Sequence, residues 1–385
     1  MESWEITKMP RYSVYGSDEF EEYVANTLGD ITAQVLEEIP AGLIKALVLG
    51  GGYGRSEGGV YYDGTTERLY NDLDIFVFSA NLAIWKKNWL NKKLRNLHNK
   101  LSVRHGLDID FSPVVSVSRL SNLDLSLRYY DLQCGHQVLY GNPHIMASLP
   151  RWKAEDIPQI EALRLMLNRG MGLFFAAEYL NSASFAQNQD FIIRNIHKAY
   201  QALAEAILIF EHSYHSSTIK RMKLIQAVDL TKYCKKAKLR QNILTSMEFK
   251  LLPKREDKSL IDLCAMYQEA KAAFREVYYA LWSLYFEVRS LSYEDYLALL
   301  QESHKPEFPV LIKNLILNLK GLPLRACLGK TGLKYPRIRL YQALPHFLFG
   351  DTANSLDLKS LLGISNKSDY QEHRDRFVSL WNCYN

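Results

Sequence analysis

Residues 49–78 read LGGGYGRSEGGVYYDGTTERLYNDLDIFVF and indicate how the N-terminal region folds. An apolar run at 46–49 leads into Gly50, Gly51 and Gly52, and a second apolar run follows at 74–78. Both runs have the length and composition of strands. Glycine adopts positive φ without penalty, so glycines at a strand end let the backbone approach a phosphate group closely. The residues between the two runs predict an inserted hairpin at 60–70 that turns at Asp63-Gly64.

The surrounding sequence mixes helices and strands up to about residue 150. Residues 18–38 carry apolar side chains at helical spacing behind Ser17, a suitable N-cap, residues 84–101 repeat the helical pattern, and 107–115 is a third strand-like run. Helical periodicity then prevails at 161–180, 190–210, 260–288 and 293–301, and Pro and Gly divide the tail into short helices. We expect an α+β (mixed) chain: an α/β domain with a small mixed sheet at 1–150, a helical-bundle domain at 151–302 and a helical C-terminal extension at 303–385.

Acidic residues are expected to converge on this sheet. Asp72 and Asp74 are two positions apart, so on a strand both point to one face, about 6–7 Å apart. In the run 107–115, Asp108 and Asp110 share the face opposite to the apolar side chains. Three carboxylates, completed by water and substrate phosphates, suit a pair of Mg²⁺ ions that serve in-line phosphoryl chemistry.

These residues resemble the DNA polymerase β-like nucleotidyltransferase superfamily, in particular bacterial stand-alone members with a helical C-terminal half. The resemblance lies in GGYGRSE at 51–57 followed by NDLDI at 71–75. It implies that residues 1–150 form a nucleotidyltransferase catalytic domain with two metal ions, Mg²⁺ or Mn²⁺. By position, Gly51 and Gly52 would hold the triphosphate of an NTP, and Asp72 and Asp74 would be catalytic and bind both metals. Asp110 would be the third catalytic and metal-binding acid. It is preferred to Asp108 because the family's third acid usually precedes apolar strand residues directly.

Two further segments extend the resemblance to about residues 45–210. VLYG at 138–141 is similar to a strand that closes the catalytic domain, and KAYQAL at 198–203 is similar to a helix whose lysine reaches the triphosphate, which gives Lys198 that role. The sequence departs from the family at Gly52, where many members have serine. Backbone N–H groups or Ser56 would then contact the phosphates, and Arg55 would add positive charge. The gap of nineteen residues between Gly52 and Asp72 is longer than usual, which the hairpin explains.

The expected reaction is transfer of a nucleoside monophosphate from an NTP to a hydroxyl acceptor, with release of pyrophosphate. The acceptor stays open among a small hydroxyl compound, an RNA 3′ end and a protein side chain. The alternative is a catalytically inactive, nucleotidyltransferase-like protein that serves in interactions or RNA binding.

Composition and charge fit an intracellular globular protein. The chain has 385 residues, 48% hydrophobic and 23% charged, and no run predicts export or a membrane span, so we expect a cytoplasmic protein with five reduced cysteines. The net charge is +5, yet residues 218–258 alone hold twelve Lys and Arg against four Asp and Glu, or +8, which leaves −3 elsewhere. This basic segment is either a solvated helical face or a surface for an anionic partner such as nucleic acid, a nucleotide or lipid head groups.

Other motifs compete weakly with this interpretation. The segment GRSEG at 54–58 matches the Gly-x-Ser-x-Gly nucleophile elbow of α/β-hydrolases, which requires a helix directly after the serine. His212 and His215 have no third ligand nearby in the sequence, which favours a surface pair over a metal site. Arg194 and Lys198 lie one helical turn apart, either as a solvated stripe or as a phosphate-facing pair.

Overall fold

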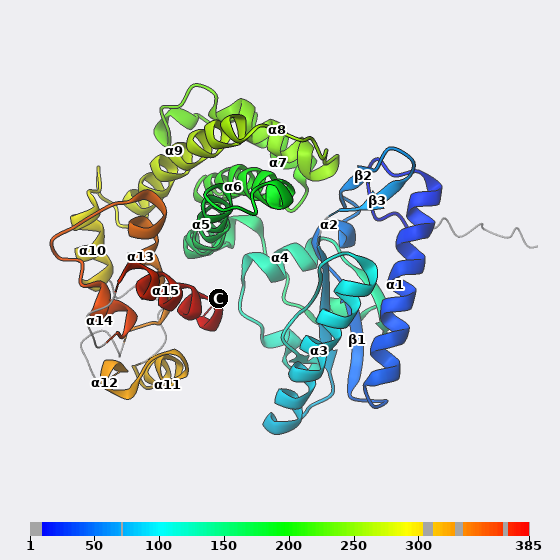
Figure 1. Cartoon of the computed structure of the whole chain (residues 1–385). Coiled ribbons are helices and arrows are strands. Elements are labelled where there is room, and N and C mark those ends of the chain that lie inside the picture. Colours follow the sequence, from blue (N-terminus) through cyan, green and yellow to red (C-terminus); the bar gives the residue numbers. More distant parts are fainter. Residues whose placement is uncertain (1–9, 71, 303–310, 328–333, 365–368, 385) are drawn as a thin grey trace, which may run out of the picture. The chain divides into compact units, whose positions relative to one another are not determined.

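The computed structural model describes residues 10–70, 72–302, 311–327, 334–364 and 369–384 (Figure 1). Asn71 of the motif therefore lies outside the described residues. Contacts divide the chain into two compact units. The first contains the described residues up to Pro158, together with Glu211–Ala227 and Leu244–Glu256; the second contains Gln159–Phe210, Val228–Ile243 and the described residues from Asp257 onward. The expected domain limits at residues 150 and 302 stay predictions.

A small mixed sheet forms the centre of the first unit, as expected. It contains β1 (Ile44–Leu49), β4 (Leu73–Ser79), β5 (Ile109–Phe111), β6 (Val115–Ser116) and β7 (Gln137–Gly141) in the order β5-β4-β1-β7, with β6 also paired to β4. β1 is antiparallel to β4 and β7, whereas β4 is parallel to β5 and β6. The predicted run 107–115 is divided at Ser112-Pro113, because proline has no N–H to continue a strand ladder.

Alternation along the strands separates two apolar cores. On one face, α1 (Asp18–Glu38) and α3 (Ile84–His105) pack against residues that include Leu47, Leu73 and Ile75. On the other face, Val48 and Phe76 pack with residues of η1 (Val117–Asn122), α4 (Leu127–Cys134) and η2 (Ile145–Ser148). The N-cap predicted for the first helix is confirmed, since the Ser17 side chain accepts a hydrogen bond from the Phe20 N–H.

The inserted hairpin is also confirmed. β2 (Val60–Tyr62) and β3 (Glu67–Leu69) form a separate two-stranded antiparallel sheet. At its turn, Asp63 Oδ1 accepts hydrogen bonds from the N–H groups of Thr65 and Thr66. These bonds form an Asx-type turn, which explains why aspartate suits this position.

The second unit is helical in its described residues, as the periodicity predicts. Its long helices are α5 (Gln159–Leu180), α6 (Gln189–Phe210) and α9 (Leu260–Tyr285), and shorter ones follow: α10 (Tyr293–Glu302), α11 (Leu311–Gly321), α12 (Leu324–Cys327), α13 (Arg337–Phe349), α14 (Leu358–Leu362) and α15 (Tyr370–Tyr384). In the sequence, α7 (Thr218–Ala227) and α8 (Leu239–Leu251) come between α6 and α9. α7 belongs to the first unit, and α8 is divided between the two units at residues 243 and 244. In the described parts of the chain, no helix is both long and apolar enough to cross a membrane.

Candidate active site

The glycines after β1 form a short helical turn, α2 (Gly51–Gly54), that lies directly against β4. The Gly50 N–H donates to the Asp74 carbonyl oxygen at 2.8 Å, which holds the turn to the strand. Gly51 has a φ of +63°, and a Cβ added there would lie 2.1 Å from Asp74 Oδ2. A side chain at position 51 would therefore displace the carboxylate. The sequence needs glycine here both for the backbone conformation and for the space.

The inserted hairpin does not separate the glycines from the acids. The Tyr53 hydroxyl donates to the Gly59 carbonyl oxygen at 2.7 Å and accepts from the Tyr70 N–H at 3.1 Å. This buried tyrosine thus ties both ends of the hairpin to α2, and the extra residues loop out between them. The longer gap between Gly52 and Asp72 is accommodated without loss of the contact between Gly51 and Asp74.

Two of the expected acids are partners on neighbouring strands. In the parallel pair of β4 and β5, the Cα partner of Asp74 is Asp110, and Asp72 comes directly before β4 on the same face as Asp74. Burial raises the pKa of Asp74 above its ordinary value, and the charge of Asp72 and then that of Asp110 raise it further. Asp108 and Asp110 are both exposed, and Asp108 lies outside β5. Burial and the two neighbouring acids therefore disfavour the ionised form of Asp74.

Two guanidinium groups oppose this charge. Arg128 and Arg55 both lower the pKa of Asp74, and Arg128 acts more strongly. The Arg128 Cζ lies 4.4 Å from the centroid of the Phe76 ring, and the residue is exposed. Arg55 is nearly buried and pairs with Asp131 at 3.4 Å. Sequence reasoning identified Arg55 but missed Arg128, because nothing in its local sequence connects α4 with the acids of β4.

A histidine from α3 adjoins the third acid. His98 Nδ1 lies 3.5 Å from Asp110 Oδ1 and 2.9 Å from the Ile109 carbonyl oxygen. The imidazole ring thus lies beside the Asp110 carboxylate at the edge strand of the sheet. The helical spacing of residues 84–101 places His98 on a helix, but only the tertiary structure brings it to Asp110.

The donor set suits a hard divalent ion. Carboxylate oxygens are the protein ligands that Mg²⁺ prefers. Burial and then repulsion raise the pKa of Asp74, and a bound cation would relieve both costs. Within the described residues, no three His, Cys, Asp or Glu side chains already have the geometry of a metal site. Binding would therefore require Asp72, Asp74 and Asp110 to turn toward a common point, with water and phosphate oxygens filling the rest of the shell.

The residues that follow α2 anchor a distant segment of the first unit. The carboxylate of the buried Glu57 accepts hydrogen bonds from Ser217 Oγ and from the Thr218 N–H, both at 2.6 Å, and so caps the N-terminus of α7. Asp131, the ion-pair partner of Arg55, accepts a hydrogen bond from the Tyr214 hydroxyl at 2.9 Å. The motif thus fastens residues 211–227 to the first unit.

Ser56 has a structural partner. Its hydroxyl donates to the Arg11 carbonyl oxygen at 2.7 Å, and its φ is +60°. A positive φ also occurs at nucleophile elbows, but here α2 precedes the serine and β2 follows it. The order of elements is therefore opposite to that of an elbow.

Lys198 and the two histidines lie elsewhere. Lys198 is half-buried on α6 in the second unit, so its expected contact with the triphosphate stays a prediction. Arg194 pairs with Asp190 at 3.3 Å along the same helix. His212 Nδ1 lies 3.2 Å from the Glu155 carbonyl oxygen, and His215 Nδ1 accepts from the Ser217 N–H. Both histidines thus take part in local backbone contacts.

Part of the basic segment 218–258 is used internally. Arg221 is almost fully buried and donates to the carbonyl oxygens of His215 and Ser216, and Arg240 donates to the Val228 carbonyl oxygen. Lys236 pairs with Glu276 at 3.6 Å. The charge excess in this segment therefore overstates its free positive surface.

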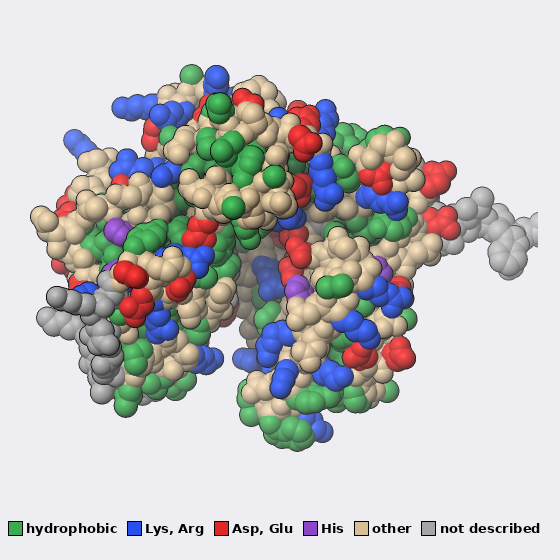
Figure 2. Space-filling model, in the orientation of Figure 1, with side chains coloured by type: hydrophobic (Ala, Val, Ile, Leu, Met, Phe, Trp, Pro, Cys, Tyr) green, Lys and Arg blue, Asp and Glu red, His purple; other side chains and the backbone are tan. Residues whose placement is uncertain are grey.

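A second basic element escaped the sequence analysis. α3 contains no Asp or Glu and carries seven basic residues, Lys86, Lys87, Lys92, Lys93, Arg95, Lys100 and Arg104. Lys93 and Lys100 pair with Glu38, and Arg104 pairs with Asp30. The outer side of α3 also exposes Trp85 and Trp89, at 66% and 42%. In Figure 2, blue Lys and Arg side chains lie beside green hydrophobic ones at the end of the first unit that α3 forms.

Comparison of the chain with known protein families, with curated proteins and with solved structures gives no match.

Proposed function

We propose that the chain is a metal-dependent nucleotidyltransferase, which moves a nucleoside monophosphate from an NTP to a hydroxyl acceptor. The observation that carries the proposal is the register pairing of Asp74 with Asp110, next to a glycine turn that leaves no room for a side chain at position 51. An acid pair on adjacent strands beside a glycine turn combines metal ligands with backbone donors for phosphate oxygens.

The residues of the first unit have separate roles in this reaction. Asp72, Asp74 and Asp110 would hold Mg²⁺ or Mn²⁺, which when bound supplies charge neutralisation for the phosphates and activates the acceptor oxygen. The N–H groups of Gly51 and Gly52 belong to the first turn of α2, where a helix has no internal acceptors, so they are available to phosphate oxygens. Arg128 and Arg55 offset charge that grows as the acceptor oxygen attacks the α-phosphorus and pyrophosphate leaves.

The surface of α3 supports RNA as the acceptor. Its exposed tryptophans offer faces on which unpaired bases stack, and Lys92 and Arg95 are exposed on the same side, where they can contact the backbone phosphates. Through His98 this helix also adjoins Asp110. RNA bound on α3 would lie on the same unit as the acids.

Labelling with α-³²P nucleotides tests the proposal. The protein is incubated in cell extract with each NTP and Mg²⁺ or Mn²⁺, and the labelled product is separated into RNA, protein and small molecules. We expect a metal-dependent product with the wild type that is absent with Asp72→Asn and Asp74→Asn. Wild-type turnover in either variant would refute the assignment of the acids. No label transfer and no NTP binding would favour the inactive, interaction-protein alternative.

A further inference from the structure

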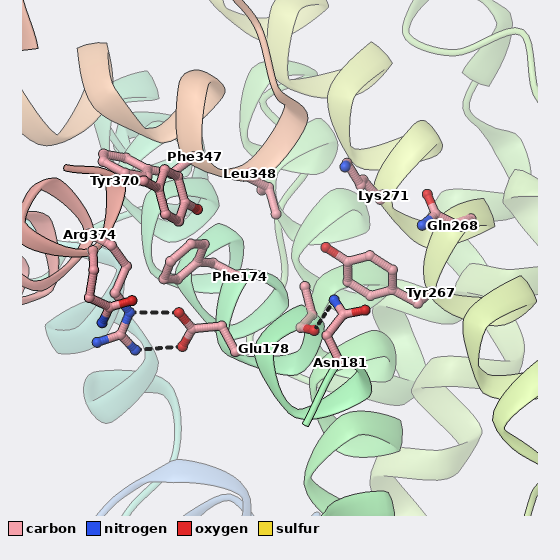
Figure 3. A pocket seen from close by; sticks show the side chains of 12 residues that line it. Phe174, Glu178, Asn181, Tyr267, Gln268, Lys271, Phe347, Leu348, Tyr370 and Arg374 are labelled. Carbon is pink, nitrogen blue, oxygen red and sulfur yellow. Dashed lines mark hydrogen bonds and ion pairs between the residues drawn. The ribbon is translucent and has the colours of Figure 1, made fainter. Parts of the chain in front are cut away.

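The second unit contains a cavity of about 570 Å³ that no part of the proposed reaction uses (Figure 3). Side chains from α5, α9, α13 and α15 line it. The volume lies within the range of cavities that bind small organic molecules, about 300–1,000 Å³. All lining residues belong to the second unit, so the cavity includes none of the acids of the first.

One side of the cavity is apolar and largely aromatic. Phe174, Phe347 and Leu348 are buried residues of this side, and the rings of Phe174 and Phe347 meet edge to face with centroids 6.1 Å apart. Tyr370 is 60% exposed, and its ring lies 6.0 Å from that of Phe347. These rings form a surface for a flat apolar group, which prefers offset or edge-to-face contacts.

α9 contributes a positive charge. Figure 3 shows the ammonium of Lys271 and the hydroxyl of Tyr267, one helical turn apart, on the same side of the cavity. Among the described residues, Lys271 forms no ion pair. The carboxylate of Asp351 is engaged by Arg275 at 2.7 Å and by the Tyr279 hydroxyl at 2.6 Å. Burial lowers the pKa of Lys271, and the charge of Asp351 opposes this only in part. An anion placed beside Lys271 would relieve this cost.

The second cation of the cavity is already neutralised. Arg374 Nε and Nη2 donate to the two carboxylate oxygens of Glu178 at 2.6 and 2.5 Å, a bidentate pair. The charged lining residues are Glu178, Lys271 and Arg374, so the lining has a net charge of +1, and Lys271 carries the charge that no lining residue balances. The cavity therefore combines an apolar, aromatic side with two hydrogen-bond donors on α9, the ammonium of Lys271 and the hydroxyl of Tyr267.

We propose that this cavity binds a small aromatic acid, with its anionic group at Lys271 and Tyr267 and its ring on Phe174, Phe347 and Leu348. The chain thus has a ligand site separate from the acids of the first unit. Neutral aromatic molecules of the same shape bind more weakly, because they leave the charge of Lys271 unpaired.

Calorimetric titration of the full chain with 2-naphthoate and with 2-naphthamide tests the proposal. The two probes share the ring system and differ in charge. We expect saturable binding of one naphthoate per chain, about tenfold tighter than that of the amide, as a charged hydrogen bond provides. Lys271→Gln is expected to remove this preference and leave binding of the amide unchanged.

Two further variants define the site. Lys359→Gln removes an exposed lysine on α14 that does not line the cavity, and it is expected to bind both probes as the wild type does. Ala177→Trp fills the cavity from α5 and is expected to abolish binding of both probes. Equal affinity of the wild type for the two probes, naphthoate binding that Lys271→Gln leaves intact, or no saturable binding at millimolar concentration would each overturn the proposal. Label transfer by Asp72→Asn and Asp74→Asn tests the proposed reaction of the first unit and does not test ligand binding in this cavity.

Discussion

Asp74 on β4 and Asp110 on β5 are directly paired in a parallel register, so their side chains emerge on the same face of the sheet. Gly51 lies against the first of them, and His98 lies beside the second. Four elements, α2, β4, α3 and β5, thus meet at two carboxylates. This arrangement makes the site sensitive to small changes of volume and charge, which can be measured separately.

Substitution by alanine tests whether position 51 lacks space for a side chain. Gly42 and Gly51 both have positive φ, but a Cβ at Gly42 would meet nothing within 4 Å, whereas one at Gly51 would meet Asp74. Gly42→Ala is expected to lower the free energy of unfolding by about 1–2 kcal/mol, the cost of the backbone conformation alone. Gly51→Ala is expected to lower the free energy of unfolding by more than this and to abolish the proposed nucleotidyl transfer. Equal losses in urea unfolding experiments would contradict the close contact with Asp74.

The charge of Asp74 should destabilise the metal-free fold. Its pKa is raised in the folded state, so folding disfavours the ionised form and stability falls as the pH rises above the unfolded value of 3.8. Asp74→Asn is therefore expected to raise the melting temperature in EDTA at pH 7. This difference in melting temperature should shrink near pH 3, where Asp74 is protonated, and in Mg²⁺, which is expected to stabilise the wild type. A lower melting temperature for the variant in EDTA would show that Asp74 is not under repulsion.

Glu57 should have the opposite pH dependence. Burial raises its pKa, but hydrogen bonds from Ser217 and Thr218 outweigh burial and leave the pKa below the ordinary value of 4.5. The stabilisation is therefore present above pH 4.5 and is lost as the pH falls through the lower folded pKa. Glu57→Gln is expected to cost about 1–3 kcal/mol at pH 7, and the difference from wild type should narrow in acid. A pH-independent difference in urea unfolding would contradict the role of the charge.

The exposed side of α3 should bind single-stranded RNA. Trp85→Ala is expected to weaken binding of a labelled oligonucleotide by about 1–3 kcal/mol if a base stacks there, and Lys92→Gln should reduce the salt dependence. Lys100→Gln is the matched control, because Lys100 already pairs with Glu38. Equal effects of Lys92→Gln and Lys100→Gln in fluorescence anisotropy titrations would contradict a defined surface, as would binding that none of the variants changes.

Local patterns predicted the strands, the hairpin and the places of Asp74 and Asp110 on neighbouring strands, because spacing and turn chemistry act over a few residues. Ser17, Asp63-Gly64 and the alternation around Asp74 all act within such distances. The positions of Arg128 and His98 near the acids could not be predicted in this way, since only the tertiary structure brings their helices to β4 and β5.

The sequence was least informative about buried charges. Glu57 caps a helix that begins 161 residues later. Arg221 is buried and donates hydrogen bonds to nearby carbonyl oxygens. The charge excess counted over residues 218–258 includes Arg221, although its guanidinium is buried. The same count overlooked α3, because its acidic partners, Glu38 and Asp30, lie on α1. A count of charge within one segment cannot separate paired from exposed residues.

The most direct test of the proposed reaction follows two labels on one nucleotide. Protein is incubated with Mg²⁺, the acceptor fraction and NTP labelled with ³²P at either the α- or the γ-position, using wild type, Asp110→Asn and Asp108→Asn. We expect the α-label to enter the acceptor and the γ-label to appear in pyrophosphate, with loss of both in Asp110→Asn and retention in Asp108→Asn. Transfer of the γ-label to the acceptor, or full activity of Asp110→Asn, would contradict the account.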